Sequence, residues 1–417
     1  MSNSARQSAA RACRFCGEPL EFTLVDLGMS PLCESFLSLE QVNGMECFYP
    51  LHVYVCGKCH LAQLEEYVDA KDIFTEYAYF SSYASSWLKH AQNYTEAMIG
   101  RFGLHKDGLV VEIASNDGYL LQYFVQSGIP VLGIEPAKNV AKVAMEKGVP
   151  TLTEFFGREL AQQLRNSGKQ ADLIAGNNVL AQVPDINDFV EGIRILLKPT
   201  GVMTIEFPHL MRLIEENQFD TIYHEHFSYF SFVTAEKIFS AHGITLFDVE
   251  EFPTHGGSLR LFGRHAENDA LPVTCRVLEL RKRELDAGLA QMSYYSDFGE
   301  RVKETKRKLL DFLIATKRDG RSIAGYGAPG KGNTLLNYCG IRTDFLDYTV
   351  DRNPYKHGKF LPGTHIPIYP VERILETKPD FVFILPWNFK QEIMEQMAVI
   401  REWGGKFVVP IPEVTVY

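Results

Sequence analysis

What the sequence lacks excludes several classes of protein. No apolar run in the 417 residues approaches the roughly 18 residues that a membrane-spanning helix needs. Residues 1–14 lack the apolar core of a secretory signal. Positive charge is not in excess, because 42 Lys and Arg residues against 52 Asp and Glu residues give a net charge of -10. A protein that follows a nucleic-acid backbone needs a basic surface. We therefore expect a cytoplasmic enzyme that binds neither membranes nor nucleic acid.

Cysteine is scarce outside the first 60 residues, which hold six of the eight. Two Cys-x-x-Cys pairs occur there: Cys13 with Cys16, and Cys56 with Cys59. Such pairs place four thiolates around a tetrahedral metal, usually Zn(II), and leave no open position for a substrate. In a cytosolic chain this is favoured over a disulfide. We predict a structural zinc in a module that ends near Tyr67. Cys33 and Cys47 are interpreted as ordinary residues, although either could replace one ligand.

Apolar runs of strand length alternate with helical periodicity from residue 109 onward. The strands predicted for a central domain are residues 109–113, 131–135, 171–178 and 201–207. A second alternating pattern comprises residues 322–327, 345–350, 381–385 and 406–409. Residues 276–318 are rich in Arg, Lys, Glu and Leu at helical spacing and predict long helices. Alternation of this kind favours doubly wound parallel sheets.

The predicted fold class is therefore α/β, in four parts. They are an N-terminal zinc-binding module (1–67), a central doubly wound domain (68–275), a helical connection (276–318) and a C-terminal second Rossmann-like α/β domain (319–417).

The first strand-to-helix turn of the central domain, residues 113–118, has too few glycines for a dinucleotide. Only Gly118 is a glycine, whereas the dinucleotide fingerprint needs three. Glu135 ends the next strand, 23 residues after Glu112, where an acid can bind ribose hydroxyls. The pair resembles a class I S-adenosylmethionine site, although acids and glycines are common at such turns in any α/β protein. The predicted cofactor-binding residues are Glu112, Ser115, Asn116, Asp117, Gly118, Glu135, Asn177 and Asn178.

A second glycine-rich turn, residues 325–333, follows a strand and opens a helix. Free amides at a helix N-terminus and a nearby Lys suit a phosphate group, so Lys331 and Asn333 are predicted diphosphate contacts. A purely structural turn explains the sequence nearly as well. Three residues after the next strand are candidates to frame a nucleotide base: Asp351, Asn353 and Lys356.

The segment 221–231 contains two His, one Glu and two Tyr residues among aromatics. Imidazole titrates near neutral pH, and a neighbouring carboxylate can orient and tune it, so this mixture can move protons. A structural polar network is the alternative interpretation. Beside a cofactor-binding domain we favour the functional one.

Taken in order, these motifs resemble the sugar C-methyltransferase family of deoxysugar biosynthesis. The resemblance combines the four-cysteine module, the 112–118 turn with Glu135, the Glu225-His226-Phe227 block followed by Phe230-Ser231, the His255-Gly256-Gly257 block, and residues 325–328. It covers nearly the whole chain. It implies an enzyme that methylates a ring carbon next to the ketone of a nucleotide-linked 4-keto-6-deoxy sugar. S-adenosylmethionine would lie in the central domain and the sugar nucleotide between the central and C-terminal domains, with zinc structural.

The same resemblance assigns roles in the site. Tyr223, Glu225, His226 and Tyr77 would face the sugar, with Tyr79 as the second choice to Tyr77. Two positions depart from the family pattern. Ala114 stands where a Gly is common, and Gln182 stands where a His is expected. Glutamine cannot take up a proton, so either that His is not the base or the activity of this chain is altered.

The implied chemistry needs a base, a donor to the enolate oxygen and a dry site. His226 is the preferred base, with Glu225 orienting it or binding a sugar hydroxyl, and Tyr223 and Tyr77 are candidate donors to the ketone oxygen. His255 could close on the sugar, or the glycines after it could simply form a turn.

Three alternatives stay open: a nicotinamide-dependent oxidoreductase, an O-methyltransferase acting on a sugar nucleotide, and a zinc-containing interaction protein without catalytic activity. The nucleotide is expected to be dTDP, with GDP next, and a monomer is favoured. The sequence does not determine the methylated carbon or the stereochemistry.

Overall fold

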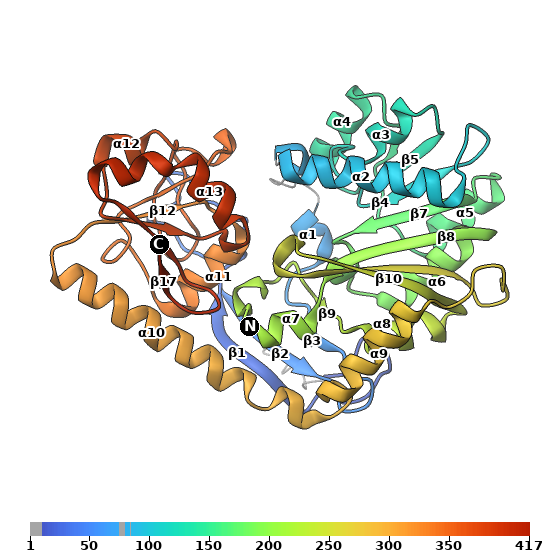
Figure 1. The fold of residues 1–417 in the computed structure, drawn as a ribbon, viewed down its shortest axis with the longest axis horizontal. Helices are drawn as coiled ribbons and strands as arrows, with labels where there is room; N and C mark the ends of the chain where they lie inside the picture. Colours follow the sequence, from blue (N-terminus) through green and yellow to red (C-terminus); the bar gives the residue numbers. More distant parts are fainter. Residues whose placement is uncertain (1–10, 75–79, 84) are drawn as a thin grey trace, which may run out of the picture.

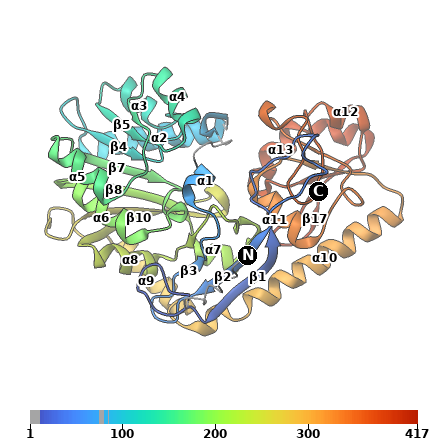
Figure 2. The ribbon, with the colours of Figure 1, turned by 180° about the vertical axis from the view of Figure 1, so that it is seen from behind.

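The computed structural model describes residues 11–74, 80–83 and 85–417. Three sheets organise it, and Figure 1 shows the central and C-terminal α/β domains side by side, joined along their lower edge by the first sheet and the long helix α10 (Phe298–Arg318). The view from behind shows the same arrangement (Figure 2). Among the described helices, none is long and apolar enough to cross a membrane. The predicted α/β class is confirmed.

The first sheet belongs mainly to the zinc module and is antiparallel. Its four strands, in spatial order, are β1 (Phe22–Ser30), β2 (Tyr49–Val55), β3 (Ala62–Leu64) and β9 (Ser228–Tyr229). The last strand comes from the chain that directly follows His226. It pairs with β3 through Ala62 opposite Tyr229, and the Leu64 N–H donates to the Phe227 carbonyl at 2.9 Å. The zinc module therefore fixes one end of the His-rich segment.

The central sheet has seven strands in the order β10-β11-β8-β7-β4-β5-β6. The strands from β8 to β6 are parallel, and β10 and β11 are antiparallel to their neighbours. Their bounds are β4 (Val110–Ile113), β5 (Val131–Ile134), β6 (Thr151–Leu152), β7 (Ala171–Asn177), β8 (Leu197–Pro208), β10 (Ile244–Phe252) and β11 (Ser258–His265). Buried parallel strands are continuous apolar runs because both faces are covered, and every residue of β4 is buried.

Helices precede and connect these strands. They are α1 (Ala70–Phe74), α2 (Ser85–Phe102), α3 (Leu121–Gln126), α4 (Lys138–Glu146), α5 (Arg158–Asn166), α6 (Ile186–Leu196), α7 (Leu210–Glu215) and α8 (Phe232–Ala241). The chain leaves β4 toward β5 on one side and later returns to β7 on the other. In doubly wound sheets this switch point is where a ligand binds, outside the carboxyl ends of the strands.

Two helices form the predicted helical connection, α9 (Cys275–Ala287) and α10. The C-terminal sheet has the order β14-β13-β12-β15-β16-β17 and is parallel except for β17. Its elements are β12 (Ile323–Tyr326), α11 (Gly330–Cys339), β13 (Thr349–Val350), β14 (Ile368–Tyr369), α12 (Arg373–Thr377), β15 (Phe381–Ile384), α13 (Lys390–Gln396), β16 (Lys406–Val409) and β17 (Thr415–Val416).

The strand predicted over residues 345–350 was wrong in its first part. The N–H groups of Phe345 and Leu346 both donate to the Arg342 carbonyl, at 3.0 and 2.9 Å. They close a turn, and the strand is confined to β13. A short apolar run can be buried without pairing in a sheet, and periodicity does not separate the two cases.

Candidate active site

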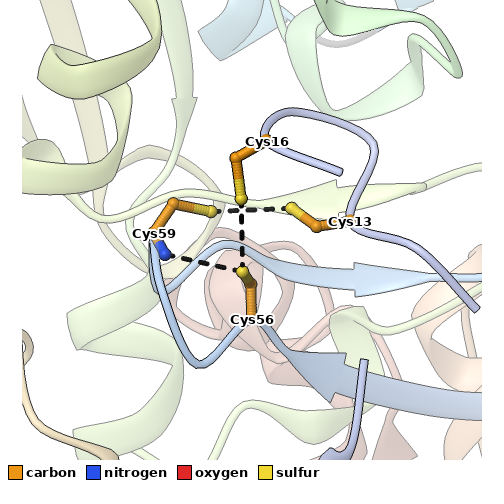
Figure 3. A group of neighbouring side chains, drawn as sticks. All are labelled: Cys13, Cys16, Cys56 and Cys59. Carbon is orange, nitrogen blue, oxygen red and sulfur yellow. Dashed lines mark hydrogen bonds between the residues drawn. The ribbon is translucent and has the colours of Figure 1, made fainter. Parts of the chain in front are cut away.

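The four cysteines predicted to bind zinc come together in the first module (Figure 3). Cys13 and Cys59 Sγ lie 3.5 Å apart, as do Cys16 and Cys56 Sγ, and all four sulfurs lie within 4.8 Å of one another. Tetrahedral Zn–S bonds of about 2.3 Å separate sulfurs by roughly 3.8 Å. Hydrogen bonding with Cys59 lowers the pKa of Cys13 below its usual value. The donor set fits Zn(II) and leaves no position for a substrate.

One cavity of 730 Å³ brings the other predicted groups together. Its walls come from the carboxyl ends of β4, β5 and β7, from the turn at residues 221–226, and from the glycine-rich turn before α11. The zinc module contributes a turn after β1, at Cys33 and Glu34. A volume of this size is typical of a small-molecule site.

Four of the predicted cofactor residues line this cavity: Asn116, Glu135, Asn177 and Asn178. The Glu135 carboxylate accepts the N–H groups of Asn116 and Ala137 at 2.9 and 2.8 Å. Each oxygen keeps a lone pair that a ribose hydroxyl could use. Burial raises the pKa of Glu135.

The other four, Glu112, Ser115, Asp117 and Gly118, lie behind this wall, not on it. Gly118 adopts φ 75° and packs closely on α4, because a Cβ there would lie 3.3 Å from Ala144. Asp117 pairs with Lys147 at 3.2 Å. Their positions favour shaping the turn over direct contact with a ligand.

Buried oxygens without partners concentrate at this edge of the sheet. Within the described residues, no hydrogen-bond partner is found for one side-chain oxygen of each of Ser115, Asp117, Asn177 and Asn178. Buried acceptors without donors are costly. S-adenosylmethionine carries an ammonium, an amino group and two hydroxyls, all of them donors. The unpartnered oxygens of Asn177 and Asn178, which line the cavity together with the Glu135 carboxylate, therefore fit this cofactor.

His226 lies in the cavity wall with a fixed tautomer. Its Nδ1 lies 3.1 Å from the Thr221 carbonyl, which can only accept, so Nδ1 carries the proton and Nε2 carries the lone pair. Burial lowers the pKa of His226 to about 4, so the ring is neutral at neutral pH. Tyr223 also lines the cavity, and its ring lies 4.1 Å from that of His226.

His224 and Glu225 flank this group differently. His224 faces the zinc module, where its Nε2 lies 3.2 Å from the Pro50 carbonyl. Glu225 lines the cavity but interacts with Cys33 through its carboxylate, while the Thr221 carbonyl, not Glu225, holds the ring of His226. Of the two roles considered for Glu225, binding a hydroxyl fits this position better than orienting His226.

The predicted substrate residues are partly brought together. Gln182, His255 and Lys331 line the cavity, whereas Asn333 is a buried residue of α11 that does not line it. His255 adopts φ 56° and packs edge-on against Trp87 at 5.1 Å. Burial and the charge of Lys331 lower the pKa of His255 to about 4. Tyr77 and Tyr79 lie outside the described residues.

Lys331 occupies an enclosed position near the turn at residues 221–226. Its Nζ donates to Asn388 Oδ1 at 2.8 Å and lies 4.6 Å from the centre of the Trp387 ring. Burial lowers the pKa of Lys331 to about 8, opposed by the charge of Asp220. The three candidates to frame the nucleotide base, Asp351, Asn353 and Lys356, also line the cavity.

Sequence reasoning missed Cys33 and Glu34. Cys33 was interpreted as an ordinary residue, yet it lines the cavity and contacts Glu225. Glu34 lies 3.7 Å from Lys356 of the C-terminal domain. No local pattern marks either residue, because both contacts join segments far apart in the sequence.

Comparisons with known proteins agree with this architecture. Three family models match in order: "Putative zinc binding domain" over residues 13–74, "Methyltransferase domain" over 87–249 and "C-methyltransferase C-terminal domain" over 253–412. The chain is 37% identical over 404 residues to the C-methyltransferase NovU of Streptomyces niveus, covering 96% of this chain and 95% of that protein.

More distant matches cover parts of the chain. A ubiquinone biosynthesis O-methyltransferase of Bartonella tribocorum is 26% identical over 97 residues, which is 23% of this chain and 39% of that protein. The crystal structure of magnesium protoporphyrin IX methyltransferase (ChlM) from Synechocystis PCC 6803 with bound SAH matches with a TM-score of 0.34 and 16% identity, covering 42% of this chain and 82% of that chain.

Proposed function

We propose that this chain, which belongs to the family of S-adenosylmethionine-dependent C-methyltransferases, methylates a ring carbon next to the ketone of a nucleotide-linked 4-keto-6-deoxy sugar. The observation that carries the proposal is the single cavity. It runs from the carboxyl edge of the central sheet, past the turn that holds His226, to the glycine-rich turn of the C-terminal domain. We assign the methyl donor to the first end and the nucleotide tail of the acceptor to the second.

His226 is the proposed base. Its Nε2 lone pair lies on a ring that the Thr221 carbonyl prevents from turning, and its low pKa keeps the ring unprotonated at neutral pH. It takes the proton from the ring carbon, and the electron pair of that C–H bond passes into the enolate. When bound, S-adenosylmethionine supplies an electrophilic methyl on a positively charged sulfur, to which the enolate carbon bonds as the methyl–sulfur bond breaks.

A weak base requires a stabilised enolate. Tyr223 is the proposed donor to its oxygen, and Tyr77 remains a second candidate from the sequence. Lys331 carries a positive charge close to this site. Burial is the main cause of the low pKa of His226, and the charge of Lys331 lowers it further. The same charge favours negative charge on the enolate oxygen. Glu225 is proposed to accept a hydrogen bond from a hydroxyl of the sugar and thereby to fix the ring carbon beside His226.

Product analysis with a panel of nucleotide-linked keto sugars tests the proposal. Incubation with S-adenosylmethionine should add one methyl to a dTDP-linked 4-keto-6-deoxy sugar, with the GDP-linked sugar as the next candidate. In heavy water, C-methylation requires loss of the ring hydrogen next to the ketone, whereas O-methylation does not. Reactions without enzyme and with His226→Ala control for spontaneous exchange. A product that retains every ring hydrogen would contradict the proposal.

A further inference from the structure

A turn of the zinc module reaches into the active-site cavity and contacts Glu225. The Cys33 Sγ lies 3.2 Å from Oε1 and 3.1 Å from Oε2 of Glu225, with 192 positions between the two residues. Both side chains are buried. A thiol is the donor in this pair, because a carboxylate can only accept. The hydrogen bond therefore connects the zinc module to the catalytic turn.

The C-terminal domain holds the thiol from the other side. Gly330 opens α11, and a Cβ on Gly330 would lie 2.7 Å from the Cys33 Sγ. Contacts this short do not occur between real side chains, so the glycine gives the sulfur its room. Cys33 is thus enclosed by the central domain, through Glu225, and by the C-terminal domain, through Gly330.

The thiol of Cys33 is a neutral donor, so it stabilises the Glu225 carboxylate by a hydrogen bond and not by an opposite charge. Burial raises the pKa of the Cys33 thiol well above its usual value, so it stays protonated. Burial raises the pKa of Glu225 to about 7, and the thiol hydrogen bond works in the opposite direction. Glu34 contributes a further charge that raises this pKa. The cation in these surroundings is Lys356, which lies 3.7 Å from Glu34 and whose charge opposes the rise in the pKa of Cys33.

We propose that Cys33 is a positioning residue for methyl transfer, whose thiol fixes the orientation of the Glu225 carboxylate and favours its ionised form. This inference rests on the proposed function in one respect, the sugar hydroxyl that Glu225 is proposed to bind. A hydrogen bond to the charged form lowers the pKa of an acid, and hydrogen bonds to charged groups are strong enough to shift it by about one unit. Cys33 would thereby increase the ionised fraction of Glu225 near neutral pH.

The pH profile of kcat/KM separates this role from simple packing. On the acidic side of this profile, kcat/KM rises with pH as Glu225 ionises, and we call this rise the acidic limb. Cys33→Ala should move the acidic limb up by about one pH unit and recover activity at alkaline pH. Cys33→Ser, which keeps a donor, should leave the limb closer to that of the wild type. Cys339→Ala removes another buried thiol that does not line the cavity and should leave the limb unchanged. A Cys33→Ala limb that coincides with that of the wild type would overturn the proposal.

A spectroscopic test works on the zinc-loaded enzyme without substrate, so it is independent of the proposed function. The S–H stretching band of Cys33, identified by subtracting the Cys33→Ala spectrum, should shift as Glu225 titrates. It should lose that pH dependence in Glu225→Gln. A band that does not respond to pH in the wild type would show that the thiol does not sense the carboxylate.

Gly330→Ala provides a second route if Cys33→Ala folds poorly. The added methyl should push the sulfur away from Glu225 and shift the acidic limb in the same direction as Cys33→Ala. In the Cys33→Ala background the methyl has room, so the double variant should behave like Cys33→Ala alone. If the shifts of the two single variants add in the double variant, Gly330 affects the pH profile by a route other than Cys33. The inference that Gly330 holds the Cys33 sulfur against Glu225 would then be rejected.

Discussion

Two buried carboxylates near the same cavity have opposite surroundings. Glu206 on β8 meets the Arg260 guanidinium at 2.7 Å and His90 at 3.1 Å, whereas Glu225 meets only the neutral thiol of Cys33 among described side chains that hydrogen-bond to it. Burial would raise the pKa of Glu206, but His90 and Arg260 together hold it at about 2. The pKa of Glu225 is instead raised to about 7.

The contrast indicates a structural role for Glu206 and a role in the reaction for Glu225. A carboxylate fixed by a guanidinium keeps its charge over the whole physiological range and holds β8 and β11 together through Arg260. A carboxylate with only a neutral donor can change its charge near neutral pH. Perturbed groups of the second kind concentrate at functional sites, and Glu225 lies in the cavity wall while Glu206 does not.

Removing zinc should have the largest effect on turnover. It should disturb the surroundings of Glu225 and leave those of Glu206 intact. The module supplies Cys33 and pairs β3 with β9, whereas Glu206 lies in the central sheet. Structural zinc contributes on the order of 10 kcal/mol to such a module. We expect chelation to abolish turnover while S-adenosylmethionine still binds, as measured by calorimetry. Full activity of the zinc-free protein would contradict this.

The two histidines beside these carboxylates should also differ. His226→Ala should lower turnover by a factor of about 10² to 10⁴, the usual contribution of general base catalysis, with cofactor affinity near that of the wild type. His90→Ala should act mainly on stability, because His90 belongs to the ion cluster of Glu206. Steady-state kinetics and thermal unfolding measure the two effects. Full activity in His226→Ala would remove it as the base.

Neutralising each carboxylate tests the contrast directly. Glu206→Gln removes the nearer of the two carboxylates that pair with buried Arg260 and leaves Glu250 at 3.4 Å. It should cost about 3 kcal/mol of unfolding free energy. Glu225→Gln removes an unpaired buried charge, so it should keep or gain stability at neutral pH while losing activity. Denaturant unfolding at neutral pH compares the two variants. Equal destabilisation by both would show that the surroundings are equivalent.

The pH dependence of stability should have opposite signs at the two sites. The folded pKa of Glu225, about 7, lies above its ordinary 4.5, so the wild type should lose up to roughly 3 kcal/mol relative to Glu225→Gln between pH 4.5 and 7. The folded pKa of Glu206, about 2, lies below 4.5. Its stabilisation is present above pH 4.5 and lost as the pH falls toward 2. If the unfolding free energies of wild type and Glu225→Gln change in parallel between pH 4.5 and 7, the prediction for Glu225 is contradicted.

Gln182 should give the smallest effect. It lines the cavity where the family resemblance leads to the expectation of a His. If the missing imidazole limits the reaction, Gln182→His should raise kcat, but by less than the factor of about 10² to 10⁴ that a positioned base contributes, because His226 is still present. Gln182→Asn is the matched control that adds no titrating group. An unchanged or lower kcat would mean that the glutamine does not impair this site.

Sequence patterns predicted the parts of the site that depend on spacing. The paired cysteines gave the zinc ligands, and the strand-to-helix turns placed Asn116 and Glu135 at one edge of a sheet. The contact of Cys33 with Glu225 could not be predicted, because it joins residues 192 positions apart. Nor could the partner of His226, since its neighbour Glu225 turns away and the Thr221 carbonyl takes that place.

The fate of the ring hydrogens most directly tests whether one cavity brings a methyl donor and a carbanion together. We expect the wild-type enzyme, given S-adenosylmethionine and a dTDP-linked 4-keto-6-deoxy sugar, to form a product whose new methyl is bonded to the carbon next to the ketone, seen by NMR, with one ring hydrogen lost. A methyl bonded to oxygen, or no product from any nucleotide-linked keto sugar, would contradict it.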